Sequence, residues 1–194
     1  HRYITNVLLH SLPPLFEIFN AHGKEVTIQF SSYIDKTALS KNHVIFLGPS
    51  KTLGILQDEL KKLDLEYQHY PHRLYYQVNE ENAEALPRQE IKGKYNYGTG
   101  YSLVTRQPGP NGNTLMIFTA FSPGSVSHTV DHILSESFNS AFKTDILKNK
   151  NMPKHFAMLF EVTSVEDDHF VTLQQYFPFQ DDQLYTTNHK GDSQ

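Results

Sequence analysis

Two segments of this chain repeat one pattern, a strand followed by a glycine-containing loop and a helix, and this pattern limits the fold more than any other feature. Residues 43–47 are apolar or aromatic apart from His43, Gly48-Pro49-Ser50 turns the chain, and residues 51–63 carry leucines at helical spacing. Residues 114–120 lead through Ser122 to Ser125 into a second amphipathic helix. Continuous apolar strands followed by helices are typical of parallel strands. We therefore predict a three-layer, Rossmann-like α/β sheet flanked by helices.

The remaining segments can be assigned by periodicity and turn residues. Helical spacing predicts a helix over 12–22, begun by Pro13-Pro14 and ended by Gly23. A strand is expected at 25–30, followed by a short helix through Leu39 capped by Ser31 or Ser32. The tyrosine-rich stretch 67–78 should contain one or two strands, and residues 79–94 should form an exposed polar excursion. Strands at 101–106 and 114–120 are expected to be joined by a turn at 107–113, and a short helix is expected at 140–148. Strands at 156–162 and 170–176 predict a C-terminal β-hairpin.

The amino-acid composition excludes several classes of functional site and binding partner. The 194 residues contain no Cys, which excludes disulfides, thiolate metal sites and a cysteine nucleophile. A net charge of −4 without long charge runs argues against direct binding of nucleic acid, and no stretch is apolar enough for a membrane helix. We expect one domain over 1–178 and a flexible tail over 179–194. Because the chain begins at His1, we also expect it to be a piece of a longer protein, so its localisation cannot be read.

Ligands of open α/β sheets bind beyond the carboxyl ends of strands, where helix N-termini point. Two loops qualify here and predict a site for a small polar or anionic ligand, with Arg106 as a charge partner. The candidate binding residues are Gly48, Ser50, Lys51, Thr52, Arg106, Ser122, Gly124 and Ser125. The simpler interpretation is that Ser50, Ser122 or Ser125 only cap their helices.

Sequence motifs for familiar chemistry are absent. Lys51-Thr52 lacks the glycines of a phosphate-binding loop, Gly98-Thr99-Gly100 lacks the third glycine of a dinucleotide fingerprint, and no G-x-S-x-G occurs. His128 and His132 have metal-like spacing, but two partly exposed surface histidines are the favoured interpretation. The aromatic stretch 67–76 could stack on a base, although strand packing explains it better. We predict no cofactor and no metal.

The order of segments resembles a known family. The block Tyr101-Ser102-Leu103-Val104-Thr105-Arg106, the turn Pro108-Gly109-Pro110-Asn111-Gly112-Asn113, the strand–Gly124–helix and the strand 156–162 are similar to a bacterial Rossmann-like domain of unassigned function. In that family the domain is the C-terminal sensor or effector part of proteins with a winged-helix DNA-binding region or a membrane segment. The resemblance covers about residues 23–176 and brings no established catalytic residues.

Three hypotheses about function follow. The first is a non-enzymatic ligand-sensing or regulatory domain of a larger bacterial signalling or transcription-related protein, signalling through the helix 12–22. The second is a small hydrolase or nucleosidase that uses His43, His128, Asp131 or His132 as acid or base. The third is a structural or homodimerising domain that uses the aromatic hairpin at 156–179.

Overall fold

The computed structural model describes residues 6–70, 72–76, 84–87, 89–91, 97–148, 150–165 and 167–179. The helices are α1 (Asn6–His10), α2 (Leu12–Ala21), η1 (Ser31–Tyr33), α3 (Lys36–Lys41), η2 (Ser50–Thr52), α4 (Leu56–Lys61), α5 (Pro123–Leu134), α6 (Glu136–Ala141) and the π-helix η3 (Phe142–Ile146). The strands are β1 (Val44–Pro49), β2 (Leu65–His69), β3 (His72–Tyr76), β4 (Glu84–Pro87), β5 (Gln89–Ile91), β6 (Tyr97–Pro108), β7 (Thr114–Ala120), β8 (His155–Val165) and β9 (Asp168–Phe179).

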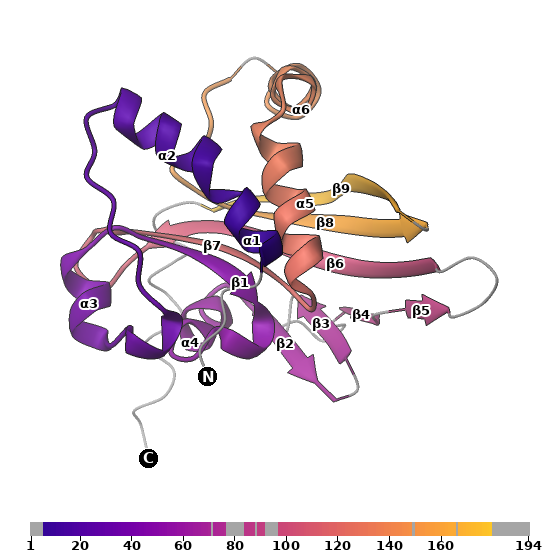
Figure 1. Cartoon of the computed structure of the whole chain (residues 1–194), viewed down its shortest axis with the longest axis horizontal. Helices are drawn as coiled ribbons and strands as arrows, with labels where there is room; N and C mark the ends of the chain where they lie inside the picture. Colours follow the sequence, from indigo (N-terminus) through magenta and orange to yellow (C-terminus); the bar gives the residue numbers. More distant parts are fainter. Residues whose placement is uncertain are drawn as a thin grey trace.

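The main sheet is mixed, with strand order β1-β7-β6-β8-β9 (Figure 1). Strand β1 runs parallel to β7, whereas the β7–β6, β6–β8 and β8–β9 pairs are antiparallel. Strand β5 pairs with the beginning of β6, and β2, β3 and β4 form a separate small sheet. Both predicted strand–loop–helix units and the C-terminal hairpin are present, although in the first unit Gly48 and Pro49 belong to β1 and the helix predicted over 51–63 is η2 followed by the shorter α4. Parallel pairing of the Rossmann-like kind, however, is confined in the described residues to β1 and β7.

Both faces of the main sheet are covered, because side chains along each strand alternate between two hydrophobic clusters. On β6, Leu103 packs with leucines of α4 and with Tyr67, whereas its neighbour Val104 packs with residues of α5 and α6. Figure 1 shows the same arrangement, with α3 and α4 on one side of the sheet and α1, α5 and α6 on the other. The predicted layering of a sheet between helices is therefore confirmed.

The segment that precedes β1 differs from its prediction in two places. Residues 25–30 form no strand and are exposed, although Val26, Ile28 and Phe30 alternate as strand residues do. The cap of the following helix is Asp35, whose side chain accepts a 2.7 Å hydrogen bond from the Ala38 amide, and not Ser31 or Ser32. The helix predicted at 12–22 is confirmed as α2, and Gly23 follows it with φ +63°.

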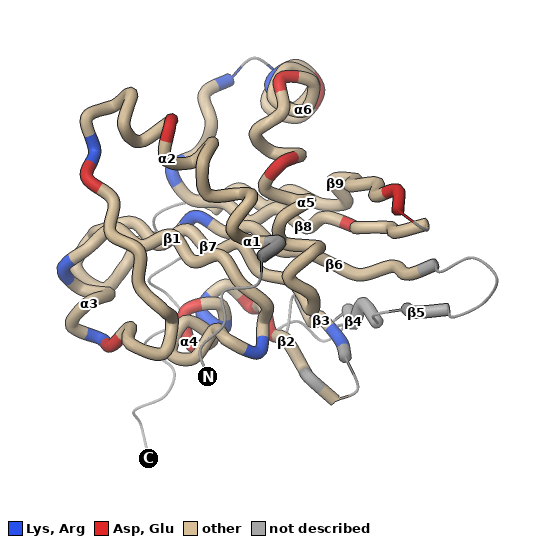
Figure 2. The backbone as a smooth tube through the Cα atoms, in the orientation of Figure 1, with Lys and Arg blue, Asp and Glu red and all other residues tan. Residues whose placement is uncertain are grey.

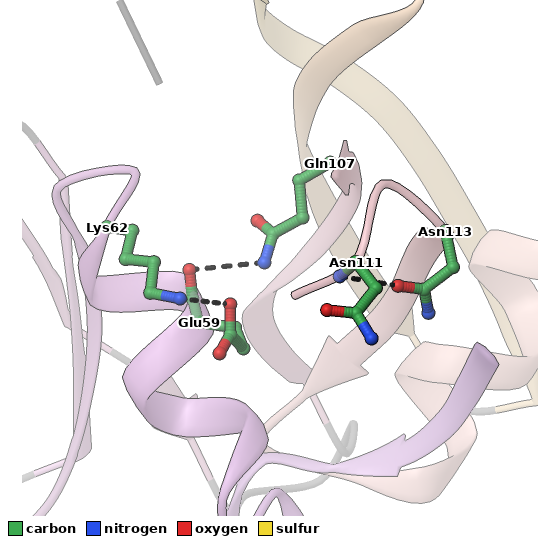
Figure 3. A network of polar contacts seen from close by, with 5 residues as sticks. All are labelled: Glu59, Lys62, Gln107, Asn111 and Asn113. Carbon is green, nitrogen blue, oxygen red and sulfur yellow. Dashed lines mark hydrogen bonds and ion pairs between the residues drawn. The ribbon is translucent and has the colours of Figure 1, made fainter. Parts of the chain in front are cut away.

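Polar side chains fasten the β6–β7 connection to the helices beside it. The side-chain amide of Asn113 donates two hydrogen bonds to carbonyls at the end of α3. One goes to the carbonyl of Leu39, at 2.6 Å, and the other to the carbonyl of Asn42. Figure 3 shows the neighbouring contacts: Gln107 donates to the Glu59 carbonyl at 3.2 Å, and the Glu59 carboxylate pairs with Lys62 at 2.7 Å. These contacts hold α3 and α4 against one face of the sheet.

Other predictions concern segments that the structure describes only in part. The tyrosine-rich stretch contains β2 and β3, as predicted, and the helix predicted at 140–148 is replaced by α6 followed by η3. Within the expected excursion at 79–94, β4 and β5 are described and the rest lies outside the described residues. The expected tail also lies outside them from residue 180 onward.

Candidate functional site

The carboxyl ends of β1 and β7 lie side by side, and the chain leaves them toward opposite faces of the sheet. In the parallel register Gly48 pairs with Thr119 and Pro49 with Ala120. After β1 the chain enters the cluster that contains Leu53 and Leu56, whereas after β7 it enters α5 in the opposite cluster. Neighbouring parallel strands whose helices diverge in this way define the usual ligand position of open α/β sheets. The two predicted loops therefore begin at one place.

The first loop supplies fewer free polar groups than its sequence suggests. Ser50 is buried, and only Lys51 and Thr52 are exposed. The Thr52 hydroxyl donates to the Pro49 carbonyl at 2.8 Å. A Cβ at Gly48 would lie 2.9 Å from Cζ of Phe46, so a larger residue here would force the buried Phe46 ring to move. Lys51 is the residue of this loop that can present a positive charge to a bound ligand.

The second loop is arranged as a helix cap. Ser122 is the N-cap of α5, and its Oγ accepts a 3.1 Å hydrogen bond from the Ser125 amide and lies 2.8 Å from Ser125 Oγ. The predicted capping role is thereby confirmed for Ser122, whereas Ser50 lies inside η2, whose N-cap is Pro49 and has no side-chain cap hydrogen bond. Nothing approaches within 4 Å of a Cβ built on Gly124, so the first turn of α5 has open space beside it.

Beyond this cap lie residues of β6, β8 and β9 that the sequence did not single out as a site, namely Gly100, Ser164 and His169. A Cβ on Gly100 of β6 would be 3.8 Å from Ser125 Oγ, so the Ser125 side chain lies over a strand position without a side chain. Two positions before Gly100, Gly98 pairs with Ser164 of β8, and Ser164 pairs with His169 of β9. Ser164 Oγ lies 2.9 Å from His169 Nδ1.

His128 of α5 completes this group, since its ring stacks on His169 with centroids 3.7 Å apart. We call Ser122, Ser125, His128, Ser164 and His169 the α5 polar cluster. Burial, and in second place the nearby His169, lowers the pKa of His128, while Asp131 opposes this shift. The cluster thus presents hydroxyls and imidazoles from three elements. The hairpin register predicts the Ser164–His169 pairing, but stacking on α5 has no sequence signal.

The histidines of the enzymatic hypothesis do not converge. His43 precedes β1, at the opposite end from the candidate site, where its Nδ1 accepts a hydrogen bond from the Thr114 amide. The His132 ring packs on Phe138 and Phe160, and burial lowers its pKa. The planes of His128 and His169 differ by only 25°, so their lone pairs cannot meet at one metal ion. The described residues contain no group of three or more metal-ligating side chains.

Arg106 also lies away from the predicted site. It pairs with Met116 near the beginning of β7, whereas the end of β7, Ala120, pairs with Ser102. Four residues of β-strand separate Ser102 from Arg106, a distance of about 13 Å. The hypothesis of Arg106 as charge partner is therefore corrected by the strand register.

Tyr67 connects the small sheet to the end of β7. Its hydroxyl donates to the Thr119 carbonyl at 3.1 Å, and its ring meets Phe121 edge-on with centroids 5.0 Å apart. Burial raises the pKa of Tyr67, which keeps the hydroxyl protonated as a donor. The β2–β3–β4 sheet is thus fixed to the strand end from which the second loop departs.

The fold and these residues define the chain as a mixed α/β domain with a candidate ligand site at the ends of β1 and β7. No protein-family model, curated protein or solved structure matches it. Among the described helices, none is both long and apolar enough to cross a membrane.

Proposed function

We propose that this chain is a ligand-sensing or regulatory domain that binds a small polar or anionic molecule at the paired ends of β1 and β7. The observation that supports this most is the β1–β7 register, since it brings the two loops together while their helices cover opposite faces of the sheet. Lys51 would supply a positive charge, and Ser122 and Ser125 would supply hydroxyls. The Rossmann-like relationship, and with it a place in a larger bacterial protein, belongs to the same proposal.

The local chemistry favours binding over catalysis. Among the described residues, the histidines considered for acid–base work are divided between His43 at one end of the sheet, His132 in an aromatic cluster and His128 in the α5 polar cluster. A general base must lie within hydrogen-bonding distance of the proton that it removes. Hydroxyls, backbone amides and one lysine recognise a polar ligand without that requirement.

A thermal-shift screen of nucleotides, sugars and organic acids tests the proposal. We expect at least one compound to raise the melting temperature of the wild-type chain, as ligand binding to the native state must. Ser125→Ala and Lys51→Ala should abolish the shift. The matched controls Ser140→Ala in α6 and Lys154→Ala just before β8, both exposed, should retain it. The proposal fails if no compound shifts the wild-type chain, or if the controls lose the response as well.

A further inference from the structure

Strand β9 is an edge strand of the main sheet in the part of the chain that the structure describes. Its one strand partner in the described residues is β8, so half of its backbone donors and acceptors point away from the sheet. None of its twelve residues is buried, whereas the first six residues of β8 all are. The opposite edge strand, β1, is half as long and has three buried residues.

The usual features that protect an edge strand are missing over the first half of β9. Figure 2 shows this strand without a basic residue, and Asp168 at its beginning is its one acidic residue. The first irregularity is the register shift after Leu173, where Gln174 has no partner on β8, and Pro178 comes later still. Residues 168–173 therefore form a regular, nearly uncharged edge on which another strand can be added.

An exposed aromatic residue lies in the middle of this stretch. Phe170 is 58% exposed and pairs with Thr163, which places it on the same face of the hairpin as Val165, itself 36% exposed. An antiparallel strand paired about Phe170 would cover the exposed ring of Phe170. If that strand were a second β9, Phe170 would lie opposite itself, an aromatic cross-strand pair of the kind that stabilises sheets.

We propose that β9 is a self-association edge through which two copies of this chain pair antiparallel about a two-fold axis near Phe170. Charge favours a second copy over a charged partner. Pairing about Phe170 sets Asp168 of each copy opposite Thr172 of the other, so the two carboxylates lie at opposite ends and no like charges meet. The joined sheets would then be continuous, and this dimer goes beyond the proposed ligand function.

The size of the contact predicts a weak dimer. Five or six paired residues bury less surface than the roughly 1,200–2,000 Å² of a stable interface. Their hydrogen bonds, each worth about 1 kcal/mol net, must offset an association cost of at least about 4 kcal/mol. We therefore expect association at high micromolar concentration, and not a permanent dimer.

Sedimentation equilibrium of the full chain from about 5 to 500 µM tests the association, over the range in which transient dimers of this size form. The mean mass should rise from 22.3 kDa toward twice that value. Phe170→Asp should keep the chain monomeric, and Ile28→Asp, a matched control at a 54% exposed site outside the sheet, should still associate. Far-UV circular dichroism checks that both variants are folded. A wild-type chain that stays monomeric, or a Phe170→Asp variant that still dimerises, overturns the proposal.

Because the chain has no Cys, single cysteine variants report the register directly. In the proposed pairing residue 170 meets itself at a Cα separation of about 4.5–5.5 Å, within disulfide range. Phe170→Cys should therefore form a covalent dimer under mild oxidation. Thr172→Cys lies about 13 Å from its own copy by strand rise and should not. Efficient cross-linking at 172 or at Ile28→Cys, without cross-linking at 170, refutes this pairing.

Discussion

Tyr67 offers the sharpest test of how the small β2–β3–β4 sheet is fixed to the main sheet. The side chain is 2% exposed, it donates one hydrogen bond to the Thr119 carbonyl, and its ring packs edge-on against Phe121. Tyr67→Phe removes the hydroxyl and keeps the ring. Tyr67→Ala removes both and leaves a cavity beside Phe121.

The expected costs differ severalfold. A net hydrogen bond contributes about 1 kcal/mol. Ser102 Oγ also donates to the Thr119 carbonyl, at 3.3 Å, so Tyr67→Phe leaves that carbonyl with a partner and should cost about 1 kcal/mol or less. Truncating a buried aromatic ring to alanine costs about 3–5 kcal/mol. The free energy of unfolding should therefore fall mainly through loss of packing.

Urea unfolding followed by far-UV circular dichroism measures both variants, since the chain has no Trp to report by fluorescence. With a slope of about 2 kcal/mol per molar urea, Tyr67→Phe should lower the midpoint by about 0.5 M and Tyr67→Ala by about 1.5–2.5 M. Tyr70→Phe, at a 92% exposed position, is the control and should change nothing. Equal losses in the two Tyr67 variants, or a loss below about 1 kcal/mol for Tyr67→Ala, would refute the packing argument.

Three further predictions concern the rest of the fold. Burial lowers the folded-state pKa of His128, so the unfolded chain binds more protons than the folded chain at mildly acidic pH. The contribution of His128 to the free energy of unfolding should be full above about pH 6.5 and be lost as the pH drops through the folded-state pKa. In urea titrations from pH 5 to 8, the free energy of unfolding of His128→Gln should therefore depend less on pH than that of the wild-type chain. Asn113→Ala removes two hydrogen bonds to the end of α3 and should lower the free energy of unfolding by about 2 kcal/mol. Asn111→Ala, at an exposed position, should leave the free energy of unfolding unchanged, and equal effects of the two variants would contradict the role of Asn113 in holding α3. Phe160→Ala, at a fully buried site, should cost about 3–5 kcal/mol by thermal or urea unfolding, against less than about 1 kcal/mol for Phe170→Ala in dilute solution.

The sequence predicted best those features that local pattern and turn chemistry determine. The turn at 107–113 and the C-terminal hairpin are present, and so are both strand–loop–helix units, although the helix predicted over 51–63 is η2 followed by the shorter α4. Residues 25–30 have the alternation of a strand but pair with nothing in the described residues, because periodicity expresses a local preference and does not supply a neighbouring strand. Likewise, the antiparallel β6–β8 pairing joins two hairpins that are distant in sequence, and no single segment encodes it.

The candidate site was predictable to the same extent. Strand ends could be located from the loops after 47 and 120, and their side-by-side placement follows from the parallel pair. Arg106 was misplaced because its distance from the site depends on the β6–β7 register. The stacking of His128 on His169 joins residues from α5 and β9, and only the packing of that helix across the sheet brings them together.

The parallel β1–β7 pair also determines when the candidate site can exist during folding. Its partners are 71 residues apart, from Val44 to Leu115, whereas the β6–β7 hairpin closes between Pro108 and Thr114, six residues apart. The logarithmic cost of loop closure makes the first pairing about 2 kcal/mol more expensive in chain entropy. The β6–β7 hairpin can therefore form before β1 pairs with it. A ligand that requires both loops then binds only after β1 is in place, and its binding stabilises that pairing.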